Sequence, residues 1–258
     1  MTLENKNAVV YGAGGAIGGA VAAAFAGAGA RVHLVGRTRE SLERTAKEIE
    51  SVGGHAEIAE LDVLDEGAVE EHARSVGAVD VSFNLVSGGD VQGIPLIDMT
   101  TADFTRPIVT RVTANYITAR AAARRMVKQG TGVILALDSG SANGSPMMGG
   151  TGPADAATDA LVRNLAAEVG PAGVRVVGLW TSGLPETLSP EKIAAHSGQP
   201  RMDAAAFQGL LQHLDGMRMT KRSPTLAQLA ATAVFLASDQ AGAITGTFVN
   251  VTSGTFPS

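Results

Sequence analysis

Residues 7–37 read NAVVYGAGGAIGGAVAAAFAGAGARVHLVGR, and this stretch decides the fold. A short apolar run over 8–11 is typical of a buried strand, and a second such run follows at 32–35. Between them lie an alanine-rich helix, expected from about 16 to 27, and the glycines Gly12, Gly14, Gly15 and Gly18. Glycines let the chain turn tightly and let a diphosphate approach the backbone, while the helix N-terminus offers N–H groups to the anion. The order strand, glycine turn, helix, strand therefore predicts a diphosphate-binding unit.

The same stretch has no charge between Lys6 and Arg31, so a membrane span has to be considered. Clustered glycine and alanine, with no block of leucine, isoleucine or phenylalanine, argue against it. Glu4 and Lys6 do not form the basic segment of a signal peptide. With no targeting signal, we expect a cytoplasmic protein.

Composition narrows the class of protein. The 258 residues are enough for one large α/β domain, and the net charge of −5 is spread along the chain. No basic run suggests nucleic acid or a membrane surface as a partner. Cysteine is absent, which excludes disulfides and a thiol nucleophile. The histidines show no metal-ligand spacing, and we expect packing or surface roles for His33, His55, His72, His196 and His213.

Beyond residue 37, strand-like and helix-like segments alternate. Further strands are expected at about 56–61, 80–85, 133–137, 174–179 and 247–251. Further helices are expected at about 38–52, 66–74, 100–128, 154–169 and 225–237, with Thr38 and Thr225 as caps. Thr100 with Asp103 predicts a capping box, and Pro107 is expected to break or restart the long helix. The alternation predicts an α/β fold, a doubly wound parallel sheet of about seven strands in a single domain over 1–258.

Residues 181–223 interrupt this alternation. The segment is rich in proline, serine and methionine, and short helices are expected within it. A segment of this length inside a compact domain is typical of a lid, so we expect it to cover a substrate. Its apolar residues favour a bulky apolar substrate over a small polar one, and the expected partner is an apolar small organic molecule, although these residues fit core or subunit contacts as well.

Taken together, the sequence resembles the short-chain dehydrogenase/reductase family over nearly its whole length. The resemblance is carried by YGAGGAIGG at 11–19, LDV at 61–63, FNL at 83–85, GVILALDS at 132–139, LAAEVGPAGVRVV at 165–177 and FLASDQAGAITGTFVNV at 235–251. It implies a Rossmann fold, an oxidoreductase and a nicotinamide dinucleotide. It also implies a homodimer or homotetramer, with subunit contacts through the last strand and the 154–169 helix.

The resemblance assigns the cofactor contacts. The family's turn is Gly-x-x-x-Gly-x-Gly, and Ala16 stands at its middle glycine, which adds one methyl group but leaves the turn permissive. Asp62 and Val63 would frame the adenine, and residues 84–86 would pass the riboses. The full set implied is Gly12, Gly14, Ala16, Ile17, Gly18, Arg37, Thr38, Asp62, Val63, Asn84, Leu85, Val86 and Thr187.

Arg37 bears on the choice between NADP(H) and NAD(H). The residue that ends the second strand lies beside the adenosine ribose, where a carboxylate would bond a 2′-hydroxyl and repel a 2′-phosphate. This chain has Arg37 there, and a guanidinium can form a charge-assisted fork to the phosphate. A solvated surface arginine is the alternative, but the position favours NADP(H).

The family's catalytic residues, Asn, Ser, Tyr and Lys, are mostly replaced. Counting along the resemblance places Arg111 at the Asn position, Thr151 at the Tyr position and Asp155 at the Lys position, and only Ser139 matches. The chain has no Tyr-x-x-x-Lys, so the general acid of carbonyl reduction is missing. We expect Arg111 and Asp155 to form an ion pair, with Asp155 also accepting from the nicotinamide ribose; both could instead face solvent.

Three functions remain open. The first is NADPH-dependent reduction of an imine or an activated C=C bond, because a protonated imine needs no tyrosine acid and Asp155 favours a cation. The second is slow carbonyl reduction with Ser139, Thr151 and a water. The third is a catalytically silent NADP-binding homologue that acts as a regulatory or partner subunit. Ser139 and the 181–223 segment favour an enzyme.

Overall fold

Seven parallel strands form the central sheet of the computed structural model, which describes residues 2–197 and 200–256. The strands are β1 (Asn7–Tyr11), β2 (Arg31–Gly36), β3 (His55–Glu60), β4 (Val81–Asn84), β5 (Gly132–Asp138), β6 (Val174–Trp180) and β7 (Thr247–Asn250). Their order in space is β3-β2-β1-β4-β5-β6-β7, so the strand order reverses between β1 and β4. In open α/β sheets, ligands bind at the carboxyl ends of the strands beside such a reversal. The predicted doubly wound α/β sheet is confirmed.

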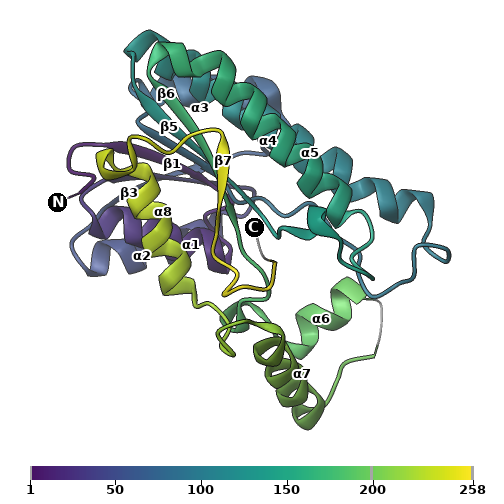
Figure 1. The fold of residues 1–258 in the computed structure, drawn as a ribbon. Coiled ribbons are helices and arrows are strands. Elements are labelled where there is room, and N and C mark those ends of the chain that lie inside the picture. The colour runs from purple at the N-terminus through teal and green to yellow at the C-terminus, as the bar shows by residue number, and fades with distance from the viewer. Residues whose placement is uncertain (1, 198–199, 257–258) are drawn as a thin grey trace.

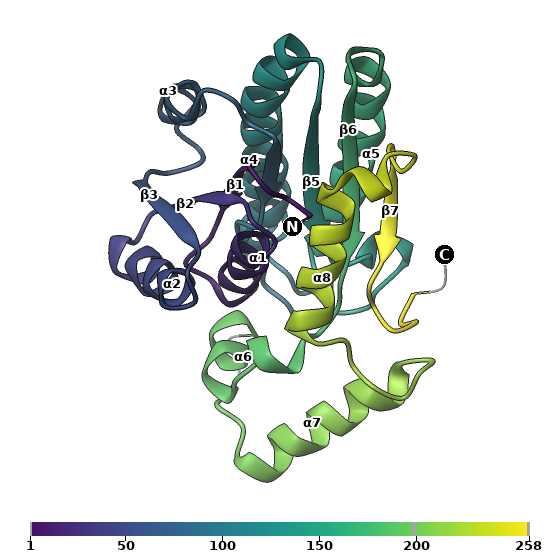
Figure 2. The ribbon, with the colours of Figure 1, turned by 90° about the vertical axis from the view of Figure 1, so that its left-hand side faces the viewer.

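Helices cover both faces of this sheet (Figures 1 and 2). One layer contains α1 (Ala16–Gly27), α2 (Arg39–Ser51) and α8 (Leu226–Ala237), and the other contains α3 (Glu66–Val76), α4 (Thr101–Gln129) and α5 (Thr151–Val169). Each layer buries its own apolar cluster against the sheet, one around Phe25 and Leu229, the other around Met126 and Val162. Strands buried on both faces explain the continuous apolar runs of the sequence.

The segment after β6 stands apart from these layers. It contains the short 3-10 turn η3 (Pro185–Thr187), α6 (Pro190–Ser197) and α7 (Ala204–Met217). Figure 2 shows α6 and α7 beyond one end of the main body, next to neither face of the sheet. No residue of α7 is fully buried, so this helix contributes little to the core. The expected helices within 181–223 are therefore present, and α7 is longer than the sequence suggested.

Helix ends follow the predicted caps in two of three cases. Thr100 accepts from the Asp103 N–H at the start of α4, and Thr225 forms a capping box with Gln228 at the start of α8. Thr38 occupies the cap position of α2, but its side chain makes no capping bond. Thr38 is therefore the N-cap residue as predicted, but its side chain does not form the hydrogen bond that a capping residue usually makes.

The prediction that Pro107 breaks the long helix is wrong. The helix α4 runs without interruption through Pro107, which is buried. A Cβ added to Gly88 or Gly150 would lie 3.2 Å or 2.9 Å from Pro107 atoms, so the ring packs tightly against both glycines. This close packing offsets the backbone hydrogen bond that proline cannot donate.

Within the described residues, each helix is either too short or too polar to cross a lipid bilayer. The same part of the chain contains no group of three or more histidine, aspartate or glutamate side chains suited to hold a metal ion. Of the histidines, His33 is buried and His55 and His213 are exposed, while the side chain of His196 lies outside the described part.

Candidate active site

A cavity of about 290 Å³ opens at the carboxyl ends of β1 and β4. The predicted cofactor residues that line it are Gly12, Gly14, Arg37, Thr38, Asp62, Val63, Leu85 and Val86. Sequence reasoning missed Ser41 and Thr110, which also line it. They come from the sides of α2 and α4, and nothing in their local sequence distinguishes them. The cavity lies at the reversal of strand order, where a dinucleotide is expected to bind.

Two glycines of the first turn are required by geometry. Gly12 has a φ of +79°, and a Cβ there would lie 2.7 Å from the Leu85 carbonyl oxygen. A Cβ at Gly18 would lie 2.2 Å from the Gly12 carbonyl oxygen, so the turn and α1 meet without room for a side chain. Ala16, by contrast, is exposed at the start of α1, and its methyl group does not close the turn. The turn therefore fits the close approach of a diphosphate.

Arg37 is exposed at the rim of this cavity. The neighbouring Arg39 is paired with Glu43 at 2.9 Å along α2. Arg37 makes no ion pair or side-chain hydrogen bond with the residues that the structure describes, and its guanidinium is available to a ligand. This arrangement suits a 2′-phosphate.

Other members of the predicted cofactor set do not line the cavity. Asn84 is buried, donates to the Asn115 side-chain oxygen at 2.8 Å and accepts from the Val86 N–H at 3.1 Å, so it shapes the loop after β4. The Thr187 hydroxyl donates to the Leu184 carbonyl within η3. Ile17 lies in the first turn of α1, outside the lining.

The predicted catalytic residues gather around Arg111 of α4. Its Nη1 donates to Asp155 Oδ1 at 2.5 Å, and its Nη2 donates to Asp90 Oδ1 and Oδ2 at 2.7 and 2.6 Å. The predicted pair of Arg111 with Asp155 is therefore present. Asp90 was missed, although its place in a glycine-bearing loop at the carboxyl end of β4 was a signal that could have found it.

Asp155 faces the protein interior and not the cofactor. Its side chain is fully buried, and Oδ2 accepts from Ser139 Oγ at 2.5 Å and from the N–H groups of Ser139 and Ser141 at 3.2 and 3.0 Å. Burial raises the pKa of Asp155, and Arg111 and these donors oppose the rise. The expectation that Asp155 accepts from the nicotinamide ribose stays a prediction, and in the structure both of its oxygens are buried and already hydrogen-bonded.

Both candidate hydroxyl groups also point inward. Ser139 Oγ donates to Asp155 and lies 2.6 Å from Ser141 Oγ. Thr151, only 2% exposed, donates to Asp90 Oδ1 at 2.8 Å. A hydroxyl that donates to a carboxylate is a poor proton donor for a substrate, so neither replaces the missing phenol.

Trp180, at the end of β6, is a packing residue. Its ring stacks on Phe248 with 5.9 Å between the ring centroids, and its Nε1 donates to Asp159 Oδ1 at 3.4 Å. The sequence left open whether Trp180 lines a substrate pocket or packs; these contacts correspond to packing.

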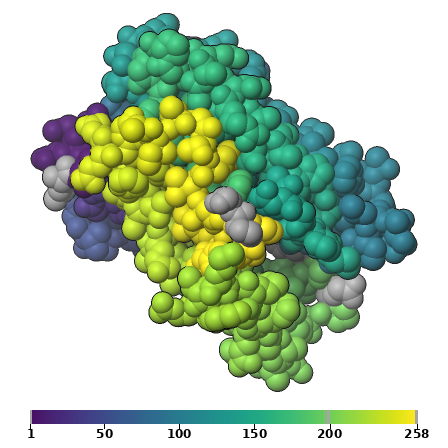
Figure 3. Space-filling model, in the orientation of Figure 1, coloured from purple at the N-terminus to yellow at the C-terminus, as the bar shows by residue number. Residues whose placement is uncertain are grey.

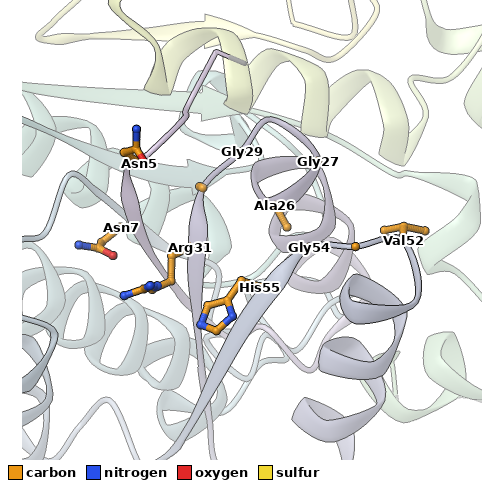
Figure 4. A pocket seen from close by; sticks show the side chains of 11 residues that line it. Asn5, Asn7, Ala26, Gly27, Gly29, Arg31, Val52, Gly54 and His55 are labelled. Carbon is orange, nitrogen blue, oxygen red and sulfur yellow. The ribbon is translucent and has the colours of Figure 1, made fainter.

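A second cavity, of about 480 Å³, lies at the opposite end of the strands, where β1, β2 and β3 begin (Figure 4). Arg31 and His55 face it from the amino ends of β2 and β3, and Asn5 and Asn7 border it at the start of β1. Ligands of parallel sheets bind at the carboxyl ends, so this cavity is separate from the candidate active site.

Known proteins match this chain along nearly its whole length. Residues 12–255 match the family described as enoyl-(acyl carrier protein) reductase. The 7alpha-hydroxysteroid dehydrogenase of Escherichia coli strain K12 is 30% identical over 98% of this chain and 95% of its own length. The L-rhamnose 1-dehydrogenase (NAD(P)(+)) of Azotobacter vinelandii is 31% identical over 99% of this chain and 98% of its own length.

Solved structures also match this chain over nearly its whole length. A 7 alpha-hydroxysteroid dehydrogenase complexed with NADH and 7-oxo glycochenodeoxycholic acid superimposes with a TM-score of 0.82. It is 27% identical over 98% of this chain and 94% of that chain. A short-chain type dehydrogenase/reductase from Mycobacterium ulcerans has a TM-score of 0.86 at 24% identity, over 99% of this chain and 91% of that chain, and supports the fold alone.

Proposed function

The chain belongs to the short-chain dehydrogenase/reductase family, and from that premise we propose that it is an NADP(H)-dependent reductase of an imine or an activated C=C bond. The family consists of oxidoreductases that bind a nicotinamide cofactor, and this coarser function holds for the chain. NADPH bound in the cleft beside β1 and β4 would supply the hydride. The choice of substrate depends on what the reaction centre lacks.

The observation that carries the proposal is the bridge from Asp90 through Arg111 to Asp155. By the family resemblance, Thr151 and Asp155 stand at the positions of the family's phenol and ammonium group, and Arg111 stands at the position of its amide. A ketone becomes an alkoxide when it accepts hydride, and here no acid is placed to protonate it. A protonated imine already carries its proton, and hydride addition converts it directly to a neutral amine. An activated C=C bond could take its proton from water.

The net charge of the proposed reaction centre also favours an imine substrate. The one positive charge of Arg111 stands against two carboxylates, Asp90 and Asp155, so the centre is negative overall. A fixed negative site stabilises a bound cation and opposes the formation of an alkoxide. The free guanidinium of Arg37 supports NADP(H) as the cofactor.

Carbonyl or alcohol oxidoreduction is the second candidate. The names of the relatives, a hydroxysteroid dehydrogenase and sugar or polyol dehydrogenases, favour it, as does the retained Ser139. A catalytically silent NADP-binding subunit is the third, favoured by the inward hydroxyl groups of Ser139 and Thr151.

One panel separates the three candidates. The purified protein is incubated with NADPH and a cyclic imine, with the ketone and the enone of the same carbon skeleton, and with a steroid ketone and an aldose. Oxidation of NADPH should be fastest with the imine or the enone. A faster rate with a ketone or aldose would establish the second candidate. Tight NADPH binding with no oxidation by any compound would establish the third.

An Asp155→Asn variant tests the role of the negative centre. It should lower imine turnover more than it changes NADPH affinity, because Asp155 is buried away from the cofactor. Asp103→Asn is the matched control, since Asp103 pairs with Arg106 at the start of α4 and should leave the rate unchanged. An unchanged rate in Asp155→Asn would refute the electrostatic role.

We also propose that the chain forms a homodimer or homotetramer, as the family resemblance implies. A groove of about 740 Å³ runs along α4 and α5 and includes Tyr116, which is 49% exposed, and Val127, which is 43% exposed. These exposed apolar side chains support a subunit contact on this face, as a homodimer or homotetramer. Light scattering after gel filtration measures the oligomeric state. We further propose a cytoplasmic location and a lid role for residues 181–223.

A further inference from the structure

A second group of carboxyl side chains, Asp138 and Asp159, lies close to Ser139 and Asp155. Asp138 ends β5, and Asp159 lies one turn beyond Asp155 on α5. Asp138 is 4% exposed and Asp159 is 7% exposed. Asp138 Oδ1 accepts from the Gly140 N–H at 2.9 Å. Asp138 Oδ2 is buried and receives no hydrogen bond from the described residues.

The group that faces Asp138 is another acceptor. Asp138 is the register partner of Trp180 in the next strand, and the Trp180 Nε1 donates to Asp159 Oδ1 at 3.4 Å, so both carboxyl groups lie beside the same indole. The charges of Asp155 and Asp159 both act on Asp138. Arg111 is the nearby cation. Its Nη1 is already paired with Asp155 and its Nη2 with Asp90. The Trp180 Nε1 donates to Asp159 and not to Asp138. Asp138 therefore has no cation to neutralise it.

Two buried carboxylates in contact cannot both stay ionised. Their repulsion is strong away from water, and a buried anionic oxygen without a donor loses its solvation and gains nothing in return. One proton removes both costs, because it neutralises a charge and converts the acceptor–acceptor contact into a hydrogen bond. We propose that Asp138 and Asp159 share a single proton as an acid pair, with Asp138 as the neutral acid and Asp159 as the carboxylate.

The electrostatic surroundings agree with this assignment. Burial, together with the charges of Asp155 and Asp159, raises the pKa of Asp138 to about 9, against the opposing hydrogen bond from the Gly140 N–H. The pair therefore keeps its proton at neutral pH and releases it in alkaline solution. Release of this proton adds one negative charge next to Ser139. The net charge around the proposed reaction centre therefore depends on pH. This inference concerns the protein without ligands and is independent of the proposed reaction.

Trp180 provides a direct readout. It is the sole tryptophan of the chain, and its indole N–H contacts Asp159. Its emission should change with pH in a transition centred near the pKa of Asp138, about 9. Asp138→Asn and Asp159→Asn should each abolish the transition, since neither variant can form the pair. The measurements are made in a Tyr116→Phe background, which removes the exposed phenol as an alternative alkaline quencher. Asp103→Asn should retain the transition.

Infrared spectroscopy gives a test that needs no variant. Wild-type protein with isotope-labelled aspartate should show the C=O band of a buried carboxylic acid at neutral pH and lose it above the transition. An absent band at neutral pH would overturn the proposal even if Asp138→Asn failed to fold. Emission that stays flat between about pH 6 and pH 11, or a transition that survives both Asn variants, would overturn it as well.

Discussion

At the scale of single residues, Arg111 connects three parts of the chain that are far apart in sequence. From α4 it reaches Asp90 in the loop after β4 and Asp155 in α5. Asp155 is fully buried and the Arg111 side chain is only 12% exposed. Each carboxylate therefore depends on this one guanidinium for its neutralisation, and loss of the cation would leave two largely buried anions with hydroxyl or N–H donors but no positive charge.

Replacing Arg111 with alanine should destabilise the fold strongly. Removing one partner of a buried ion pair costs about 3–5 kcal/mol, and here two carboxylates share that partner. Urea unfolding followed by circular dichroism measures the loss. Arg106→Ala is the control, because its pair with Asp103 is exposed and should matter little. Equal stability of the two variants would contradict the structural role of Arg111.

Replacing Arg37 with alanine should affect one cofactor far more than the other. A charge-assisted hydrogen bond is worth about 1.5–3 kcal/mol, so NADPH should bind about 10- to 100-fold more weakly and NADH nearly as before. Titration calorimetry with both nucleotides measures the difference. Arg39→Ala, which loses only the pair with Glu43, should change neither affinity much. Equal losses for NADPH and NADH in Arg37→Ala would show that the protein does not select NADP(H) through this residue.

At the scale of elements, α3 packs on the sheet through a pair of histidines. His33 of β2 and His72 of α3 meet edge to face, with 6.1 Å between the ring centroids. His33 Nε2 and His72 Nδ1 are buried and receive no hydrogen bond from the described residues. Glu57 of β3 lies 3.6 Å from His33 Nδ1, and Arg31 and His55 are the other charged or titratable neighbours. The two rings therefore pack as neutral groups.

This contact should make the stability depend on pH. Burial and, after it, the nearby His33 together lower the pKa of His72 from 6.5 to about 4, against the opposing charge of Glu57. Between these two values the unfolded chain binds a proton that the folded chain does not. Stability should be complete above pH 6.5 and fall as the pH drops toward 4.

Thermal unfolding at a series of pH values tests this. The wild type should lose stability more steeply below pH 6.5 than His72→Phe, which keeps the ring and cannot be protonated. His213→Phe, an exposed position on α7, should follow the wild type. Parallel curves for the wild type and His72→Phe would mean that the pKa of His72 in the folded protein is not lowered from its unfolded value.

At the scale of the whole molecule, Arg218 joins the α6–α7 region to the sheet. It follows α7, is 1% exposed, and donates to the Ser182 side chain at 2.7 Å and the Ser182 carbonyl at 2.8 Å. It also donates to Thr255 in the C-terminal segment. Figure 3 shows that this segment and the region around α7 meet at the surface. One buried guanidinium thus holds the end of β6, α7 and the C-terminal segment together.

Replacing Arg218 with methionine should loosen this junction selectively. Methionine retains the apolar stem but leaves the Ser182 carbonyl without a donor and removes the bond to Thr255, at a cost of about 1–3 kcal/mol. Hydrogen exchange should accelerate in residues 181–184, 204–217 and 252–255 and stay unchanged in the sheet. Lys221→Met removes an exposed contact to the Gly216 carbonyl and should change nothing. Exchange that rises uniformly, or not at all, in Arg218→Met would contradict this role.

The order of elements could be predicted from the chain alone because it depends on local patterns. Apolar runs bounded by glycine gave the strands, and Thr100 and Thr225 marked helix starts that the structure contains. The prediction for Pro107 failed because a proline's effect depends on what packs around it, here Gly88 and Gly150. The pair of Arg111 with Asp155 could be expected only because opposite charges stood at two positions that the fold brings together.

The sequence by itself determined the doubly wound sheet, the glycine turn and the loss of the phenol and ammonium group, since each is a matter of residue type and spacing. Only the tertiary structure decided that Asp155 faces the interior, that Asp90 shares Arg111, and that Asp138 and Asp159 are both buried. These residues come from separate loops, strands and helices. Whether a carboxylate meets a cation, another carboxylate or water depends on the packing of those elements, which local sequence does not specify.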